Sequence, residues 1–194
     1  MPKSICVFSG SNTGSEPAFA RVAADLGRAL VARGYGLVYG GANVGLMGIV
    51  ANTVLAAGGH VTGVIPDFLV RKELAHRGLS ELKIVSSMHE RKDAMAQASD
   101  GFIALPGGFG TVEEFFEVLT WAQLGLHAKP CGLLNVAGYY DGILTFLDSA
   151  VAHHLVKPAN RDMLIVADEP ATLLDRFERY TAPTVSKWFD AELT

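Results

Sequence analysis

Short apolar runs alternate along this chain with amphipathic stretches long enough to form helices. Most runs are continuously apolar, which is typical of parallel strands whose two faces are both covered by helices. The sequence therefore predicts an α/β fold, a Rossmann-like doubly wound parallel sheet of about seven strands flanked by helices. The expected strands are 4–8, 36–39, 60–65, 82–85, 101–105, 131–134 and 163–166. The expected helices are 15–33, 45–57, 88–98, 111–124, 139–153 and 170–180, and the charged segment 67–79 fits either a short helix or a long loop.

Length and composition predict a single domain. The chain has 194 residues, 49% of them hydrophobic, which is enough for one core without help from disulfides or metals. No internal repeat, low-complexity tract or linker divides it. We expect residues 1–194 to form one Rossmann-like domain, with a tail from about residue 181 that packs on the domain or on another subunit.

The balance of charge argues against polyanionic partners. There are 16 Lys and Arg residues against 20 Asp and Glu, a formal net charge of −4, so no overall positive field attracts nucleic acid. Residues 34–66 contain no charged side chain, but glycines and a proline divide them into pieces too short to cross a membrane. We expect neither nucleic acid nor a membrane as a partner.

Cysteine and histidine usage bears on the compartment and on metals. Cys6 and Cys131 are far apart and lack metal-ligand spacing, which predicts neither a disulfide nor a zinc site and suits a reducing cytoplasm. The first apolar run is shorter than that of a signal peptide, which also favours a cytoplasmic location. The 6 histidines show no HExxH or similar pattern, so we expect no metal.

Glycine-rich segments follow three of the predicted strands. They are 9–12 after the first strand, 40–48 after the second and 106–111 after the fifth. In an open parallel sheet, ligands bind beyond the carboxyl ends of the strands, so chemistry is expected at these segments. None of them completes a Walker loop, and Glu113 stands where the third glycine of a Rossmann fingerprint would follow Gly108 and Gly110. These absences disfavour an ATPase and a simple NAD enzyme.

The segment 106–111, with sequence PGGFGT, gives the sharpest signal and is called the glycine loop below. Its glycines remove Cβ atoms so that backbone amides can approach an anion, and a helix starting near Thr111 offers unpaired N–H groups. The loop is therefore a candidate phosphate site. It is also compatible with a tight turn whose glycines serve only backbone geometry, with Thr111 as the helix N-cap. The segment 40–48 has the same two interpretations.

Charged residues lie near the starts of two predicted helices. Arg91 and Lys92 oppose the dipole of their helix, which favours a partner anion for them over the alternative of a solvated first turn. On the helix after the glycine loop, a period of about 100° per residue places positions 112, 115, 116, 119 and 122 on one apolar face. Glu114 lies off that face, beside Val118 and Trp121, and we expect a cleft wall or a subunit interface to cover this second face.

These motifs together resemble a known family. Residues 106–114, PGGFGTVEE, are similar to the PGGxGTxxE signature of the Lonely Guy family of cytokinin-activating phosphoribohydrolases, and residues 88–92, MHERK, are placed like its companion signature. The turn 39–48 also resembles that family's second glycine turn, and the likeness covers nearly the whole chain. Phe109 stands where tyrosine is commoner, and Ala42 interrupts the usual third glycine, but neither change removes a proposed catalytic group.

The resemblance implies a homodimeric enzyme without a cofactor. It would hydrolyse the N-glycosidic bond of a nucleoside 5′-monophosphate, either a cytokinin riboside 5′-monophosphate or AMP, to a free base and ribose 5-phosphate. The family's catalytic arginine and glutamate fall on Arg91 and Glu114. The implied substrate-binding residues are Glu73, Lys92, Gly107, Gly108, Gly110 and Thr111. Many relatives carry a lysine decarboxylase label, but nothing in this sequence marks the Schiff-base lysine of a pyridoxal phosphate enzyme.

The mechanism expected from this resemblance leaves several roles open. The glycine loop holds the 5′-phosphate, Arg91 orients the substrate, and Glu114 either stabilises positive charge on the ribose or activates water. The sequence does not choose between adenine and an N6-substituted adenine. Two other hypotheses are a non-catalytic nucleotide-binding or sensing module, and a structural Rossmann domain whose glycines only form turns. An enzyme releases free base from the nucleotide, whereas a sensing module does not. A structural domain would have no affinity for AMP.

Overall fold

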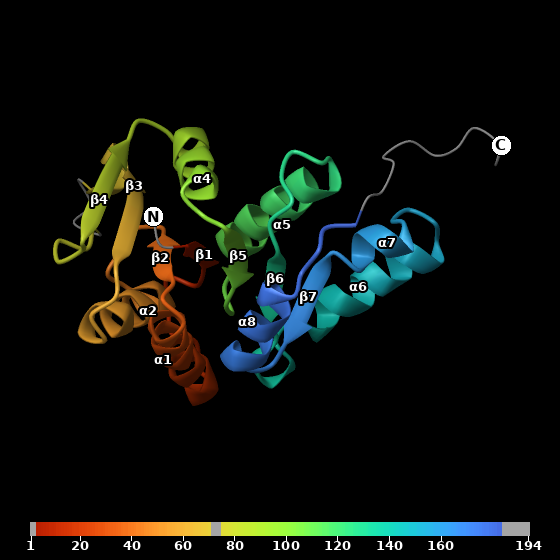
Figure 1. Cartoon of the computed structure of the whole chain (residues 1–194), viewed down its shortest axis with the longest axis horizontal. Coiled ribbons are helices and arrows are strands. Elements are labelled where there is room, and N and C mark those ends of the chain that lie inside the picture. Colours follow the sequence, from red (N-terminus) through yellow and green to blue (C-terminus); the bar gives the residue numbers. More distant parts are fainter. Residues whose placement is uncertain (1–2, 71–74, 184–194) are drawn as a thin grey trace.

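The seven apolar runs of the sequence become strands of one parallel sheet in the computed structural model, which describes residues 3–70 and 75–183 (Figure 1). The strands are β1 (Ser4–Phe8), β2 (Gly36–Tyr39), β3 (Val61–Pro66), β4 (Glu81–Val85), β5 (Gly101–Ala104), β6 (Cys131–Leu134) and β7 (Leu164–Ala167). Their order is β4-β3-β2-β1-β5-β6-β7, and all neighbours are parallel. Because the chain turns from one side of β1 to the other between β4 and β5, the sheet is doubly wound, and the predicted fold class is confirmed.

Helices occupy the segments between these strands. They are α1 (Pro17–Ala32), α2 (Gly45–Ala56), α3 (Asp67–Val70), α4 (Met88–Gln97), α5 (Phe109–Gln123), α6 (Asp141–Ala152), α7 (Pro158–Arg161) and α8 (Pro170–Glu178), with a 3₁₀ turn η1 (Val136–Gly138) before α6. The six predicted helices are confirmed to within two residues at each end. Helix α3 fills the start of the segment 67–79, and the one-turn helix α7 is an element that the sequence pattern did not indicate.

The continuous apolar runs of β1, β2, β5 and β6 arise because both faces of the sheet are buried at these strands, whereas the edge strand β4 is largely exposed. Within β1, Ile5 and Val7 face a core built with α1, α2 and α8, whereas Cys6 and Phe8 face a second core built with α4, α5 and α6. Figure 1 shows α1 and α2 on one side of the sheet and α4 and α5 on the other. A half-exposed sheet would have required polar residues at every second position.

The buried face of α5 differs from the predicted one. Phe115, Val118 and Ala122 are buried, whereas positions 112, 116 and 119 are only partly buried. Val118 belongs to the same core cluster as Met95 of α4, and Trp121 packs against that cluster. The surface that covers the second face of α5 at Val118 is therefore the chain's own core, which a single-helix periodicity does not reveal.

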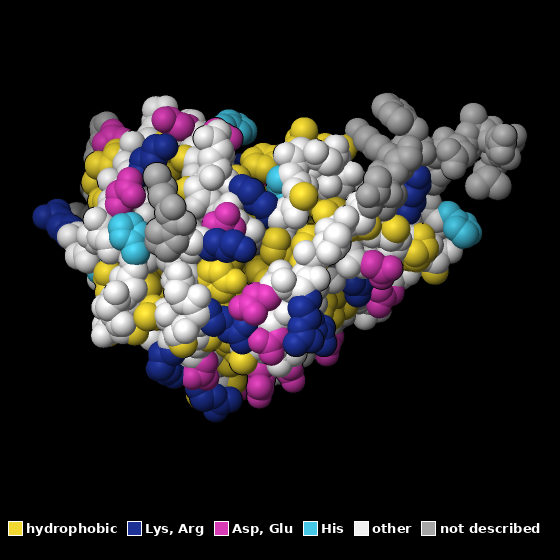
Figure 2. All heavy atoms as spheres, in the orientation of Figure 1, with side chains coloured by type: hydrophobic (Ala, Val, Ile, Leu, Met, Phe, Trp, Pro, Cys, Tyr) yellow, Lys and Arg dark blue, Asp and Glu magenta, His cyan; other side chains and the backbone are white. Residues whose placement is uncertain are grey.

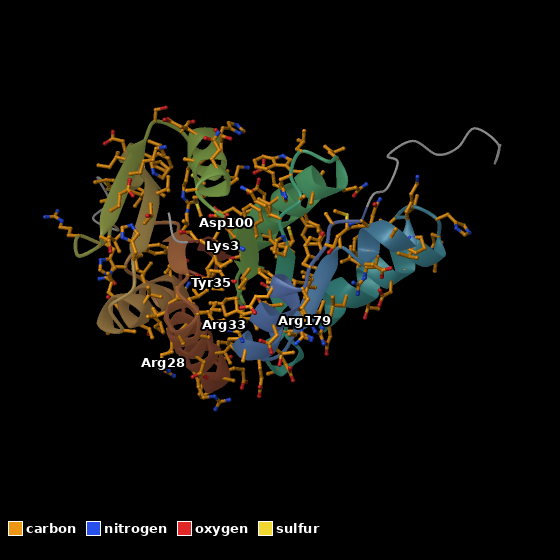
Figure 3. The ribbon with its side chains drawn as sticks, in the orientation of Figure 1. Lys3, Arg28, Arg33, Tyr35, Asp100 and Arg179 are labelled. Atoms are coloured by element: carbon orange, nitrogen blue, oxygen red, sulfur yellow. The ribbon has the colours of Figure 1, made fainter. Side chains whose placement is uncertain are left out.

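Polar side chains lie along the amino-terminal edge of the sheet (Figure 3). Tyr35 and Asp100 directly precede β2 and β5. Arg33, at the end of α1, pairs with the carboxylates of Asp175 and Glu178 on α8 at 2.6 and 3.0 Å. Exposed pairs of this kind contribute about 0–1 kcal/mol each, so the two cores supply most of the stability.

At the opposite, carboxyl-terminal edge of the sheet, the backbones of the three glycine-rich segments lie in direct contact. The Leu46 amide donates to the Gly10 carbonyl at 3.1 Å, and the Gly10 amide donates to the Pro106 carbonyl at 3.0 Å. Gly45 begins α2 with φ of 55°, and a Cβ at this position would overlap the backbone of Ser11. These contacts bind the three glycine-rich segments of the sequence into one unit.

We expect Gly45→Ala to lower the free energy of unfolding by about 2–5 kcal/mol, because the new Cβ adds a backbone clash to an unfavourable left-handed conformation. Gly58→Ala is the matched control, since Gly58 also has positive φ, 78°, but a Cβ there meets nothing within 4 Å. The control should lower the free energy of unfolding by only about 1–2 kcal/mol. Chemical denaturation of both variants measures the difference, and equal losses would contradict this direct contact of the backbones.

Candidate functional site

A hollow at the carboxyl edge of the sheet brings the sequence motifs together. Its volume is about 360 Å³, and its walls come from the β1–α1 loop, the β2–α2 turn, the end of β3, α3, α4 and the start of α5. The lining residues are Ser9, Gly10, Ser11, Gly40, Ala42, Val44, Met47, Ile65, Leu69, Arg91, Gly108, Phe109, Gly110, Thr111 and Glu114. This is the edge at which doubly wound sheets bind ligands.

Two side chains of opposite charge meet in this hollow. Arg91 of α4 is 8% exposed and Glu114 of α5 is 9% exposed, and the Arg91 Nη1 donates to the Glu114 Oε1 at 2.6 Å. The Arg91 Nε also donates to the Val64 carbonyl at 3.1 Å. Gly40 leaves room for this guanidinium, because a Cβ on Gly40 would overlap the Arg91 Nη2. The two residues that sequence analysis singled out as catalytic are therefore in direct contact.

Two features of its surroundings act on the pKa of the Glu114 carboxyl in opposite directions. Burial raises the pKa of this carboxyl above its ordinary value of 4.5, while the positive charge of Arg91 opposes the rise. Burying two charges costs free energy that their mutual attraction rarely recovers in full, so a buried pair beside an open hollow points to function rather than stability. A carboxylate with a raised pKa is a better proton acceptor and can also stabilise a positive charge next to it.

The loop before α5 presents backbone amides to the same hollow. Helix α5 begins at Phe109 with Gly108 as its N-cap, and no side chain caps it. The helix thus begins two residues before the predicted start, and the alternative interpretation that made Thr111 its N-cap is wrong. The Val112 amide donates to the Gly108 carbonyl at 3.1 Å, so the amides of the three helical residues before Val112 have no intrahelical acceptor.

The three glycines of this loop have different roles. A Cβ on Gly107 would overlap the Thr111 hydroxyl, so Gly107 is required by packing. A Cβ on Gly108 or Gly110 would meet nothing within 4 Å, and neither residue has positive φ. Neither packing nor backbone geometry explains these two glycines, which favours an anion site over a simple turn.

Three predicted substrate-binding residues are not among those described as lining this hollow, and one of them, Gly107, lines the adjoining hollow described below. Lys92 is not among the described residues that line it, and its Nζ lies 2.5 Å from Glu113 and 3.1 Å from Glu117. Lys92 therefore links α4 to α5 beside the Arg91–Glu114 pair. Glu73 lies outside the described residues, and so does the predicted tail beyond residue 183.

A second hollow of about 240 Å³ adjoins the first and shares Gly10, Ser11 and Gly108 with it. Tyr139, which also lines it, donates its hydroxyl to the Gly107 carbonyl at 2.7 Å. Sequence analysis missed Tyr139, which supports the glycine loop from the segment after β6. Its position beyond the carboxyl end of a strand was the available signal.

The outer surface carries mixed charge. On the face shown in Figure 2, basic and acidic side chains lie next to one another rather than in separate patches. Among the residues that the structure describes, no helix combines the length and the apolar character needed to cross a membrane.

Comparison with known sequences identifies close relatives. A family model described as "Possible lysine decarboxylase" matches residues 47–177. The chain is 50% identical over 177 residues to the probable cytokinin riboside 5′-monophosphate phosphoribohydrolase LOGL6 of Oryza sativa subsp. japonica, covering 91% of this chain and 71% of that protein. It is 49% identical over 178 residues to the cytokinin riboside 5′-monophosphate phosphoribohydrolase LOG7 of Arabidopsis thaliana, covering 92% of this chain and 82% of that protein.

Solved structures share the fold at much lower identity. The molybdenum cofactor carrier protein of Chlamydomonas reinhardtii matches with a TM-score of 0.69 and 20% identity, over 92% of this chain and 98% of that one. The molybdenum cofactor binding protein of Rippkaea orientalis matches with a TM-score of 0.69 and 22% identity, over 92% and 97%. At this level of identity the likeness concerns the fold alone.

Gly110→Ala should have opposite effects on the stability of the free protein and on ligand binding. Alanine in the first turn of α5 should stabilise the free protein by roughly 0.5–1 kcal/mol, because glycine loses more backbone entropy on folding. The added methyl group should at the same time weaken the binding of a phosphate-bearing ligand such as AMP by obstructing the amides. Thermal unfolding and calorimetric titration measure the two effects, and unchanged affinity would contradict an anion site at this loop.

Proposed function

We propose that this chain, which belongs to the Lonely Guy family, hydrolyses the N-glycosidic bond of cytokinin riboside 5′-monophosphates and of AMP, releasing the free base and ribose 5-phosphate. Membership follows from 50% identity over 91% of the chain to the rice relative. The observation that carries the proposal is the buried Arg91–Glu114 pair in the same hollow as the uncapped start of α5. An anion site beside a buried carboxylate suits a substrate with a phosphate and a reacting sugar.

The 5′-phosphate is placed at the start of α5. The free amides of Phe109, Gly110 and Thr111 and the positive end of the helix dipole both favour an anion there. Gly108 and Gly110 allow close approach because they present no side chain to the ligand. Anchoring the phosphate fixes the ribose, so that binding energy from this remote group serves the reaction at the anomeric carbon.

Glu114, about one turn further along α5, faces the ribose in this arrangement. A water molecule attacks C1′ as the bond from C1′ to the base nitrogen breaks, and the base leaves with the bonding electrons and takes up a proton. Positive charge develops on the ribose, and the Glu114 carboxylate stabilises this charge and accepts the proton that the water loses. Arg91 holds the carboxylate in place through the 2.6 Å hydrogen bond.

The base is placed against the apolar wall of the hollow. Val44, Met47, Ile65 and Leu69 supply this wall from the β2–α2 turn, α2, the end of β3 and α3. A purine ring, with or without an apolar N6 substituent, loses water-exposed area against such side chains.

The remaining predicted residues have supporting roles in the proposal. Gly107 positions Thr111, and Lys92 fixes α4 against α5 through Glu113 and Glu117. Glu73 is proposed as a substrate contact on the family resemblance alone.

Pyridoxal phosphate chemistry, suggested by the description of the family model, does not fit the hollow. A Schiff base needs a lysine at the site, and the described residues that line the hollow include none. Lys92, the nearest in sequence to Arg91, has its amine bound by two carboxylates. We therefore derive no step through that cofactor.

We further propose that the protein is a cytoplasmic homodimer. Large apolar side chains that a partner subunit would cover support the dimer, since Phe109 is 97%, Leu155 80% and Leu126 71% exposed. Cys6 and Cys131 are free thiols, which suits a reducing compartment.

The decisive test of the activity is chromatographic detection of free base from AMP and from N6-isopentenyl-AMP. We expect Glu114→Gln to reduce base release by roughly 10²- to 10⁴-fold, the usual range for loss of an acid–base group, while nucleotide binding persists. Glu113→Gln is the matched control and should retain most of the activity, because its carboxylate is exposed and outside the hollow and Lys92 keeps Glu117 as a partner. Full activity in Glu114→Gln would remove Glu114 from the mechanism, and a wild type that binds nucleotide without releasing base would indicate a sensing module.

A further inference from the structure

Ser9 carries a buried hydroxyl that no group in the described chain satisfies. It directly follows β1, is 9% exposed, and lines the hollow that contains Arg91 and Glu114. Two other buried side-chain oxygens in the described residues also have no partner, the Tyr39 hydroxyl and the Glu117 Oε2, but neither residue lines that hollow. An unpaired buried hydroxyl destabilises a fold, so its position at a ligand site calls for a functional explanation.

The backbone at Ser9 runs beside the glycine loop of residues 106–111. The next residue, Gly10, donates its amide to the Pro106 carbonyl at 3.0 Å, and a Cβ on Gly10 would lie 3.4 Å from the Gly107 Cα. Ser9 therefore adjoins the loop at which the phosphate is proposed to bind. The apolar side chains proposed to hold the base come from other segments, namely the β2–α2 turn, α2, the end of β3 and α3.

We propose that the Ser9 hydroxyl is a substrate-binding group that donates a hydrogen bond to an oxygen of the ribose 5-phosphate half of the nucleotide, an inference that rests on the proposed function. Arg91 is the one cationic side chain among the described lining residues, and its Nη1 is already bound to Glu114. Neutral donors must therefore supply much of the binding to the sugar phosphate. A serine hydroxyl suits this role because it rotates to meet its acceptor.

Ser9→Ala in the full chain tests this assignment through two effects of opposite sign. The free variant should melt at the same temperature as the wild type or higher, because an unsatisfied buried hydroxyl has been removed. Its affinity for AMP and for ribose 5-phosphate, measured by calorimetry, should fall about tenfold, as expected for one lost hydrogen bond to a charged ligand. Adenine should bind equally to both proteins, and KM for AMP should rise with little change in kcat.

Ser99→Ala is the matched control, since Ser99 is 3% exposed but its hydroxyl donates to the Met95 carbonyl at 2.8 Å. This variant should melt at a lower temperature and keep wild-type affinities. The assignment is overturned if Ser9→Ala also melts lower with unchanged affinities, or if it loses adenine binding as strongly as ribose 5-phosphate binding. If the wild type binds ribose 5-phosphate but releases no base, the proposed function is refuted. The comparison of wild type with Ser9→Ala would still decide whether the Ser9 hydroxyl binds the sugar phosphate.

Discussion

Removing the Arg91 guanidinium and the Glu114 carboxylate from water costs free energy that their attraction alone does not return, so the surrounding fold has to hold them. The end of β3 supplies a carbonyl at 3.1 Å from the Arg91 Nε, and Gly40 at the end of β2 supplies the space for the guanidinium. The sheet order places these strand ends next to each other. The parallel sheet thus serves as the frame for one buried ion pair, and the pair in turn orients the carboxylate toward the hollow.

Much of this architecture could be predicted from the sequence. Continuous apolar runs predicted a sheet buried on both faces, and helices on both sides confirm it for all strands except the largely exposed edge strand β4. Strand ends rich in glycine predicted a ligand site at one edge of the sheet, and Arg91, Glu114, Gly108 and Gly110 line one hollow there. Their convergence could be predicted because parallel strands bring their carboxyl ends to one edge, so residues far apart in sequence meet there.

The errors have physical causes in the contacts between elements. Periodicity along α5 predicted only part of the buried face, because Val118 joins the same core cluster as Phe115 and Met95. The three glycines of the loop also differ in ways that the sequence does not show. A Cβ on Gly107 would overlap Thr111, whereas a Cβ on Gly108 or Gly110 would meet nothing within 4 Å. The pairing of Lys92 with two glutamates is likewise visible only once α4 and α5 lie side by side.

We propose that one hollow holds the phosphate at the start of α5 and the reacting sugar beside Glu114. A crystal structure with ribose 5-phosphate would show both positions. We expect phosphate oxygens within hydrogen-bond distance of the amides of Gly110 and Thr111, with the anomeric carbon facing the Glu114 carboxylate. A phosphate bound away from the glycine loop, or a sugar whose anomeric carbon points away from Glu114, would refute this arrangement.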